Sequence, residues 1–264
     1  MGKVIFGFDF LDYAPSVSVG AANAAYPVTQ LANYKSRTQH CESQAATDFA
    51  VVFDFGAAKE VKGVVLVDVN FASCYLEGNS SNAWGAPAWR NPSPAGNIAI
   101  VQDIVTRRRS IFIDLRQDTF NYQFLRVFVP GQATTDGAGH FRWSTAVFLL
   151  SSGILEMSEW PDLGYLYDAP KRYSRKGYTT GGSESCELSD QIGSVEMKWG
   201  RFDKSSEADL WTLNDVGQAV PMIFYENLGN TSRVLCGEIA SDLKPALIQP
   251  AYLSTATVRF EEYA

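Results

Sequence analysis

The sequence has little of what most catalytic and metal sites need. It contains two histidines, His40 and His140, and neither lies in an HExxH motif, so both are expected in loops or at strand ends. Its four cysteines form no C-x-x-C pair, which argues against zinc and redox motifs and favours buried free thiols. A GxSxG motif and a phosphate-binding glycine loop are also missing. The sequence therefore predicts a protein that is not an enzyme and needs no metal or cofactor.

Long apolar runs and an excess of positive charge are absent as well. No run reaches the ~18 apolar residues of a membrane-spanning helix, so membrane insertion is not expected. The first residues are too short for a secretory signal and are expected to form a first strand. The balance of 22 basic and 29 acidic residues gives a net charge of −7, which offers no attraction to a phosphate backbone and argues against binding of nucleic acid.

Short apolar runs bounded by Gly, Pro, Asn and Asp dominate what is present, and this pattern is typical of antiparallel β-sandwiches and barrels. The chain of 264 residues exceeds the ~100–200 residues of one domain. A mixed stretch around residues 151–170 favours a boundary there, giving domains 1–155 and 156–264. The strands expected in the first domain are Val4–Phe8, Phe49–Phe55, Gly63–Val69, Ile98–Val101, Ser110–Asp114, Phe124–Phe128 and Ser144–Leu150. The polar segment Glu77–Gly96, with three prolines, is expected to be a loop.

The second domain combines strands with one predicted helix near residues 205–216. Ser205 or Ser206 can cap that helix, and Leu210 and Leu213 form an apolar stripe. The expected strands are Glu184–Leu188, Val195–Trp199, Met222–Tyr225, Arg233–Ile239 and Tyr252–Phe260. In the last of these, alternate residues from Tyr252 to Phe260 are expected on one face.

One candidate contact surface combines aromatic rings with a cation. Such combinations are common where proteins bind sugars or other proteins. The residues are Tyr34, Trp84, Trp89 and Arg90. The alternative is that the tryptophans only pin a long loop to the sandwich.

A second candidate contact surface is a compact positive patch on an otherwise acidic chain. It consists of Arg107, Arg108 and Arg109, which could contact an acidic patch on a neighbouring subunit. A solvated turn is the alternative.

Several segments follow one another in a recurring order: Tyr26–Asn33, Phe49–Gly56, Lys59–Val61, Gly63–Leu66, Phe120–Val129 and Arg142–Leu150. This order resembles that of discoidin-type domains, the coagulation-factor type C family. The resemblance covers most of residues 20–152 and implies a jelly-roll β-sandwich in the N-terminal domain.

In the second half, the predicted elements follow one another as Arg175–Phe202, Ser205–Val216 and Ala219–Tyr225. By order and type of element, this half is similar to the ring-forming domain of distal tail and tail-tip proteins of tailed bacteriophages. It implies a non-enzymatic virion protein, assembled in the host cytoplasm, whose C-terminal β-barrel or sandwich forms a ring of three or six copies. Such a ring would contact tail-tube and hub proteins, with DNA only passing through its lumen. Tyr252, Ser254, Val258 and Phe260 are then candidate inter-subunit contacts.

A carbohydrate-binding module that recognises a host-surface glycan is the alternative function. It would use the loops of Tyr34, Trp84, Trp89 and Arg90, and it is compatible with a structural role in a tail.

Overall fold

The structure is a computed structural model that describes most of the first half of the chain and separate segments of the second half. The described residues are 4–33, 39–103, 109–157, 167–171, 174–178, 184–188, 192–199, 202–203, 207–217, 222–227, 232–239, 245–249, 252–255 and 258–262. Strands dominate, and α1 (Glu207–Gly217) is the single α-helix within these ranges. The predicted mainly β class with one short helix is therefore confirmed.

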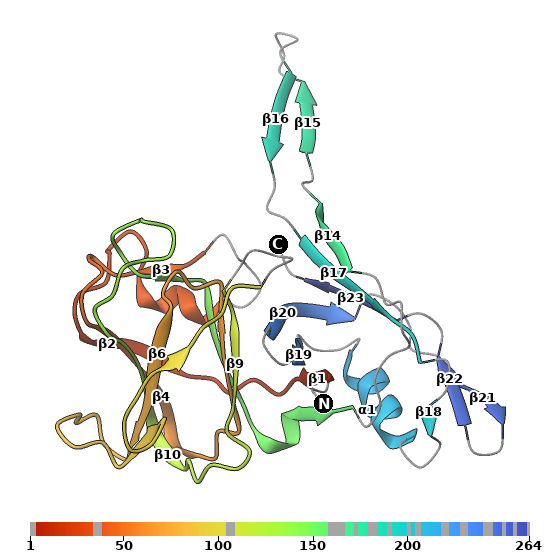
Figure 1. Ribbon diagram of the computed structural model, residues 1–264, viewed down its shortest axis with the longest axis horizontal. Coiled ribbons are helices and arrows are strands. Elements are labelled where there is room, and N and C mark those ends of the chain that lie inside the picture. Colours follow the sequence, from red (N-terminus) through yellow and green to blue (C-terminus); the bar gives the residue numbers. More distant parts are fainter. Residues whose placement is uncertain are drawn as a thin grey trace.

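The first half folds into a β-sandwich, seen on the left of Figure 1. One sheet has the order β2-β4-β10-β6-β7, with β8 paired to β6, and the opposing sheet has the order β12-β5-β9. The first sheet consists of β2 (Ala14–Val19), β4 (Phe49–Lys59), β6 (Ser73–Asn79), β7 (Trp89–Asn91), β8 (Ile98–Ala99) and β10 (Tyr122–Val129). The second consists of β5 (Gly63–Val67), β9 (Ile111–Asp114) and β12 (Thr145–Leu149). This arrangement confirms the predicted sandwich.

An aromatic core fills the space between the two sheets. Alternate residues of β4 and β10 point inward, so that Phe53, Leu125 and Val127 are fully buried. Phe53 packs against Phe148 of β12 at 4.7 Å between ring centroids, and Trp143 lies against the same ring. Burial of these large rings supplies much of the hydrophobic stabilisation of the sandwich.

One end of the sandwich carries short elements and loops. The elements are the strand pair β3 (Cys41–Glu42) and β11 (Arg142–Trp143), and the 3-10 helix η1 (Val28–Ala32). Figure 1 shows β3 at this end, apart from the contact with the second half. These elements position the candidate site described below.

The second half is built around a seven-stranded antiparallel sheet of order β13-β1-β19-β20-β23-β17-β14. Its strands are β1 (Val4–Gly7), β13 (Ile154–Glu156), β14 (Tyr167–Lys171), β17 (Ile192–Met197), β19 (Met222–Asn227), β20 (Ser232–Ile239) and β23 (Val258–Glu262). The helix α1 packs Leu210 and Leu213 into a core that also holds Trp199, Phe224 and Phe260, which confirms the predicted apolar stripe. The predicted cap residues Ser205 and Ser206 lie outside the described residues.

The remaining described strands form two small sheets beside the seven-stranded one. They are the hairpin β15 (Ser174–Tyr178) with β16 (Glu184–Leu188), and the sheet of β18 (Phe202–Asp203), β22 (Tyr252–Thr255) and β21 (Pro245–Gln249). Figure 1 shows the hairpin extending away from the body of the protein.

The first strand does not belong to the sandwich, contrary to the sequence-based expectation. β1 exists, but it pairs with β13 and β19 of the seven-stranded sheet. The reason is that both faces of β1 are apolar: Phe6 packs against Phe224, and Ile5 faces the sandwich. The predicted division between residues 155 and 156 falls inside β13, and it stays a prediction as a folding boundary.

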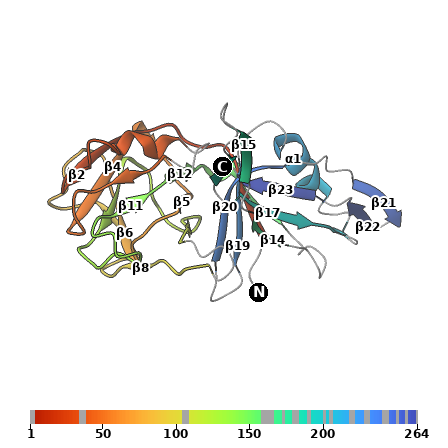
Figure 2. The ribbon, with the colours of Figure 1, turned by 90° about the horizontal axis from the view of Figure 1, so that it is seen from above.

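Figure 2 shows β5 and β12 on the side of the sandwich that faces β19 and β20. The two halves pack there through a shared apolar layer. The outward face of β5, β9 and β12 lies against β1, β19 and β20. The residues of this layer are Ile5, Val65, Val67, Phe112, Val147, Leu149, Ile223, Val234 and Cys236. Because both of its faces are covered, β5 is buried at every position.

Two other sequence-based expectations are wrong. Part of the loop predicted at 77–96 is strand, because β6 continues to Asn79 and β7 pairs with it. The single strand predicted from Tyr252 to Phe260 is two strands in different sheets, since β22 pairs with β18 and β21 whereas β23 pairs with β17 and β20. Tyr252 and Phe260 therefore do not share one strand face.

Three of the cysteines are buried thiols that form no disulfide. These are Cys41, Cys74 and Cys236. Burial, followed for Cys41 by the charge of Glu42, raises the pKa of Cys41 and that of Cys74 to about 12, so both stay protonated thiols at neutral pH. Among the described helices, none has the length and apolar character required to span a bilayer.

Candidate functional site

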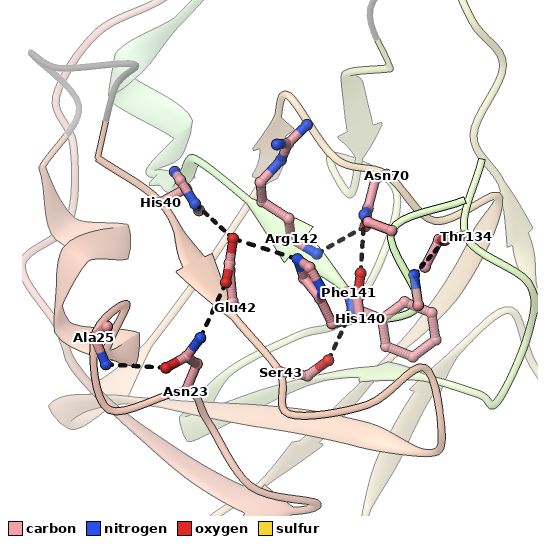
Figure 3. A network of polar contacts seen from close by, with 12 residues as sticks. Asn23, Ala25, His40, Glu42, Ser43, Asn70, Thr134, His140, Phe141 and Arg142 are labelled. Carbon is pink, nitrogen blue, oxygen red and sulfur yellow. Dashed lines mark hydrogen bonds and ion pairs between the residues drawn. The ribbon is translucent and has the colours of Figure 1, made fainter. Parts of the chain in front are cut away.

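A polar network centred on Glu42 occupies the loop end of the sandwich (Figure 3). His40 lies just before β3 and His140 just before β11, so pairing of these short strands brings both imidazoles to Glu42. The Nε2 atom of His40 lies 2.9 Å from Oε1 of Glu42, and that of His140 lies 3.4 Å from the same oxygen. The Asn23 amide donates a hydrogen bond of 3.1 Å to the other oxygen, Oε2.

Glu42 is held as a buried carboxylate. Burial by itself raises the pKa of Glu42, but the hydrogen bond from His40, the two nearby imidazoles and the Asn23 amide outweigh it. The pKa of Glu42 therefore lies below the ordinary value for a glutamate. Its partners fix it in one orientation at the floor of the site.

A second group of contacts surrounds Asn70, on the connection between β5 and β6. Its side-chain amide donates to His140 O at 2.9 Å and to both carboxylate oxygens of Asp136, at 3.1 and 3.2 Å. Its side-chain oxygen accepts a 2.7 Å hydrogen bond from the backbone N–H of Arg142. The guanidinium of Arg142 also lies 3.5 Å from Asp136 Oδ2. Asn70 is buried, whereas the side chains of Asp136 and Arg142 remain 34% and 45% exposed.

An exposed aromatic ring borders this network. The ring of Tyr26 stacks on that of His40, with centroids 4.6 Å apart and planes 14° apart. Tyr26 is 38% exposed, whereas many of the aromatic residues that the structure describes are buried in a core. The backbone of Tyr26 accepts a hydrogen bond from Glu42 N–H, so the ring is tied to the network that it borders.

The network offers fixed hydrogen-bonding groups beside an aromatic surface. Solvent can reach the side chains of Tyr26, Asp136, His140 and Arg142. They provide a ring, a carboxylate, an imidazole and a guanidinium, which together donate and accept hydrogen bonds. In the part of the chain that the structure describes, no three His, Cys, Asp or Glu side chains are placed to hold a metal ion. The arrangement suits binding of a polar ligand with a flat apolar face.

The structure separates Trp84 and Arg90 from Trp89, although the sequence grouped all three. Arg90 pairs with Glu77 across β7 and β6 on the outer face of the six-stranded sheet, whereas Trp89 pairs with Gly78 on the core face. The Trp89 ring meets Phe120 edge-on at 5.0 Å between centroids. Trp89 therefore pins the loop to the sandwich, as the structural alternative predicted.

Trp84 and Arg90 belong to a stack on the outer face. The Arg90 guanidinium lies 3.8 Å over the ring of Tyr75, and that of Arg126 lies 4.5 Å over the ring of Trp84. Arg126 forms a buried ion pair with Glu77. The rings of Tyr75 and Trp84 each pack against a guanidinium group of the same protein. This contact favours an anchoring role for Trp84 as well.

The remaining predicted contact residues either lie outside the described residues or form a hydrogen bond within the chain. Tyr34, Arg107 and Arg108 lie outside the described residues. Arg109 donates a 2.6 Å hydrogen bond to Ile100 O.

The four predicted inter-subunit contacts do not form one surface. Tyr252 and Ser254 lie in β22, where the structure describes only their backbone. Val258 and Phe260 are fully buried in the core under α1, so their assignment as surface contacts is wrong. Their alternation reflects packing against Leu210 and Phe224 rather than an exposed face.

The sequence placed both histidines correctly at strand ends but did not reveal that they meet. His40 and His140 are a hundred positions apart, and only the pairing of Glu42 with Arg142 across β3 and β11 brings them together. The one local signal was the spacing His40-Cys41-Glu42, which puts the imidazole and the carboxylate on one side of an extended segment.

Comparison with known proteins gives matches among solved structures alone. No family model matches the sequence, and no curated protein does. The chain is similar to the structure of SpGH29, with 13% identity over 53% of this chain and 27% of that one and a TM-score of 0.39. It is also similar to CBM32-1 from a family 31 glycoside hydrolase of Clostridium perfringens, with 10% identity over 52% of this chain and 94% of that one and a TM-score of 0.40. Reduced XRCC1, bound to the DNA polymerase β catalytic domain, is 12% identical over 54% of this chain and 99% of that one, with a TM-score of 0.39.

These matches cover about half of the chain and involve proteins of different activities. At this level of similarity they assign no function. Assembly into a ring and a place in a phage tail stay predictions, because neither the comparisons nor the described residues test them.

Proposed function

We propose that this chain is a glycan-binding module and that its sugar site is the Glu42 network with the ring of Tyr26. The observation that carries the proposal is the exposed Tyr26 ring, which stacks on His40 and is connected through Glu42 to His140, on the loop that also carries Asp136 and Arg142. Buried partners hold the polar groups of this loop in place. A pyranose ring has a flat face of C–H groups that packs on an aromatic ring, and hydroxyls at its rim that pair with carboxylates and guanidinium groups. The site presents both kinds of surface.

Prearrangement of the polar groups favours this proposal. A ligand loses affinity when loose side chains must be ordered on binding. Asp136 is bonded by Asn70 and by the backbone N–H of Ala138, and His140 is fixed through its carbonyl to Asn70 and its imidazole to Glu42. The site can therefore bind hydroxyls without a large ordering cost.

The proposal places the sugar away from the loop of Trp84, Trp89 and Arg90. The ring of Trp89 is packed on Phe120, and Arg90 lies over Tyr75, so neither group is free to form a sugar platform. The proposal keeps the glycan-binding function that the sequence suggested as an alternative, but assigns it to different residues.

The test is a glycan array followed by titration calorimetry with the best ligand. Tyr26→Ala and Arg142→Ala should each weaken binding by about ten-fold or more, which is ~1.4 kcal/mol, because one removes the stacking surface and the other a charged donor. Tyr26→Phe keeps the ring and should bind nearly as well as the unmodified protein. Trp211→Ala is the control, since Trp211 is an equally exposed aromatic residue on α1 in the other half.

Two results would overturn the proposal. One is a folded protein that binds nothing on a broad array. The other is a bound glycan whose affinity is unchanged in both Tyr26→Ala and Arg142→Ala, which would place the glycan elsewhere on the protein.

A further inference from the structure

Asn70 has an unusual position among the residues of the site. It lies on the connection between β5 and β6, far in sequence from the loop of residues 134–142 that carries the exposed polar groups. It is 3% exposed, so its own side chain is not placed to meet a ligand in solvent. Yet it contacts three groups that the proposed function assigns to ligand binding: Asp136, His140 and Arg142.

Both donors of the Asn70 side chain and one of its two acceptor positions are used. An asparagine amide has two N–H donors and one carbonyl acceptor with two lone pairs. One N–H goes to His140 O, the other is shared between the Asp136 carboxylate oxygens, and the carbonyl accepts Arg142 N–H. The backbone adds three bonds: Asn70 N–H donates to Arg142 O, and Asn70 O accepts from both the N–H and the hydroxyl of Thr135.

These contacts fix each end of the exposed loop. Thr135 and Asp136 lie at its start and Arg142 at its end, so one buried residue sets the distance between the Asp136 carboxylate and the backbone from which the Arg142 side chain extends. Neither Asp136 nor Arg142 is packed tightly by itself, since both side chains are about a third exposed or more. We propose that Asn70 is the positioning residue of this site, holding Asp136, His140 and Arg142 in the one arrangement that binds the ligand.

Other side chains at position 70 would not reproduce this arrangement. An alanine would remove the hydrogen-bond partner of Arg142 N–H and that of His140 O. An aspartate keeps the shape but loses both donors, and it places a second negative charge about 3 Å from Asp136. When one of two such carboxyl groups is protonated, the acid can donate to its neighbour and the contact is restored.

The test uses Asn70→Asp, because the variant has the same shape and responds to pH. This part rests on the proposed function and uses the glycan identified by the array. At about pH 8, Asn70→Asp should bind at least ~30-fold more weakly than the unmodified protein, and the affinity should recover by about ten-fold or more as the pH is lowered toward 5. Histidine side chains change charge between pH 5 and 8, and His40 and His140 belong to this network, so the recovery is measured as the ratio of the affinity of the variant to that of the unmodified protein at each pH. Asn121→Asp, an exposed surface position, is the control for the added charge.

Two further measurements distinguish the positioning role of Asn70 from a merely structural role. Circular dichroism at the binding temperature must show that the variant is folded throughout. The double variant Asn70→Asp with Asp136→Asn exchanges amide and carboxylate, so a donor again faces an acceptor. It should recover part of the affinity at pH 8, which general destabilisation would not produce.

A readout without ligand keeps this inference testable if no glycan binds. The carboxyl carbon of Asp136 can be titrated by NMR, and its pKa should rise in Asn70→Asp but not in Asn121→Asp. If Asn70→Asp binds like the unmodified protein at pH 8 while Tyr26→Ala does not, the proposed function stands and the role of Asn70 is wrong. An unchanged titration of Asp136 would also contradict that role.

Discussion

Glu42 shows at the scale of a single residue how burial and hydrogen bonding compete. Its side chain is almost wholly buried, which disfavours the charged form, yet His40, His140 and Asn23 surround both oxygens and keep it ionised. A carboxylate in such a setting contributes both to stability and to the shape of the surface above it.

The lowered pKa of Glu42 predicts how stability depends on pH. Because the pKa is lower in the folded than in the unfolded chain, the contribution is present above the unfolded value of ~4.3 and is lost as the pH falls through the folded value. At pH 7, Glu42→Gln should lower the free energy of unfolding by about 1–2 kcal/mol, since hydrogen bonds to a charged group are lost. At about pH 3 the difference from the unmodified protein should shrink.

Urea unfolding at a series of pH values measures this effect. Glu60→Gln is the matched control, because Glu60 is 62% exposed in its pair with Lys62 and should change stability by less than ~0.5 kcal/mol. A constant difference between Glu42→Gln and the unmodified protein from pH 7 to 3 would contradict the assignment.

In the exposed part of the site, burial and hydrogen bonding also have opposite effects on the pKa of Asp136. Burial raises the pKa of Asp136, but the backbone N–H of Ala138, the Asn70 amide and the charge of Arg142 outweigh it and lower the pKa below its ordinary value. The carboxylate is therefore ionised at any pH near neutrality and can accept hydrogen bonds from two hydroxyls.

At the scale of elements, strand pairing decides what each side chain of a loop can do. Trp84 and Trp89 are five positions apart in one polar segment, but β7 pairs with β6 and points Trp89 into the core. Gly78 lies opposite Trp89, and a Cβ atom there would come within 2.7 Å of Phe120, so this site needs glycine. The segment is thereby anchored to the sheet rather than presented to solvent.

The two tryptophans should differ in their contribution to stability. Trp89→Ala removes a ring packed on Phe120 and should lower the free energy of unfolding by about 2–3 kcal/mol. Trp84→Ala removes a cover over Arg126 and should cost about 0.5–1 kcal/mol. Chemical denaturation of both variants checks the order, and a larger loss in Trp84→Ala would contradict the anchoring role of Trp89.

At the scale of the whole molecule, the two halves are joined by apolar and ionic contacts. The face formed by β5, β9 and β12 is covered by β1, β19 and β20. Arg233 of β20 reaches Asp103, a residue of the first half, with 2.9 Å between Nε and Oδ2, and both residues are buried. Arg116 and Glu156 form a further pair across the same junction, at 2.5 Å.

The buried pair predicts non-additive effects of mutation. Arg233→Met or Asp103→Ala alone leaves a buried charge without this partner and should lower stability by about 3 kcal/mol. The double variant should lose clearly less than the sum of the two single losses, because no such charge remains. A thermodynamic cycle from urea unfolding measures the coupling, and strict additivity would show that the two charges do not stabilise each other.

Some of this architecture was predicted by local pattern. Strands such as β4, β5, β10 and β12 bury apolar side chains that their sequences show directly, and α1 carries an apolar stripe with acidic residues in its first turn. These features depend on neighbours in the sequence, so periodicity reveals them. The short apolar runs bounded by Gly, Pro, Asn and Asp likewise predicted a mainly β protein.

Other features depend on which strand lies next to which, and only the tertiary structure decided them. β1 lies in the seven-stranded sheet rather than in the expected sandwich, because both of its faces are apolar and each packs against an apolar cluster. The segment from Tyr252 to Phe260 was divided between two sheets, and His40 met His140 through the pairing of β3 with β11. Long-range pairing has no local signal, because the hydrogen bonds that fix it are made by backbone groups that every residue shares. The sequence by itself determined strands such as β4, β5, β10 and β12 and their buried faces, whereas the candidate site came from contacts between segments far apart in the chain.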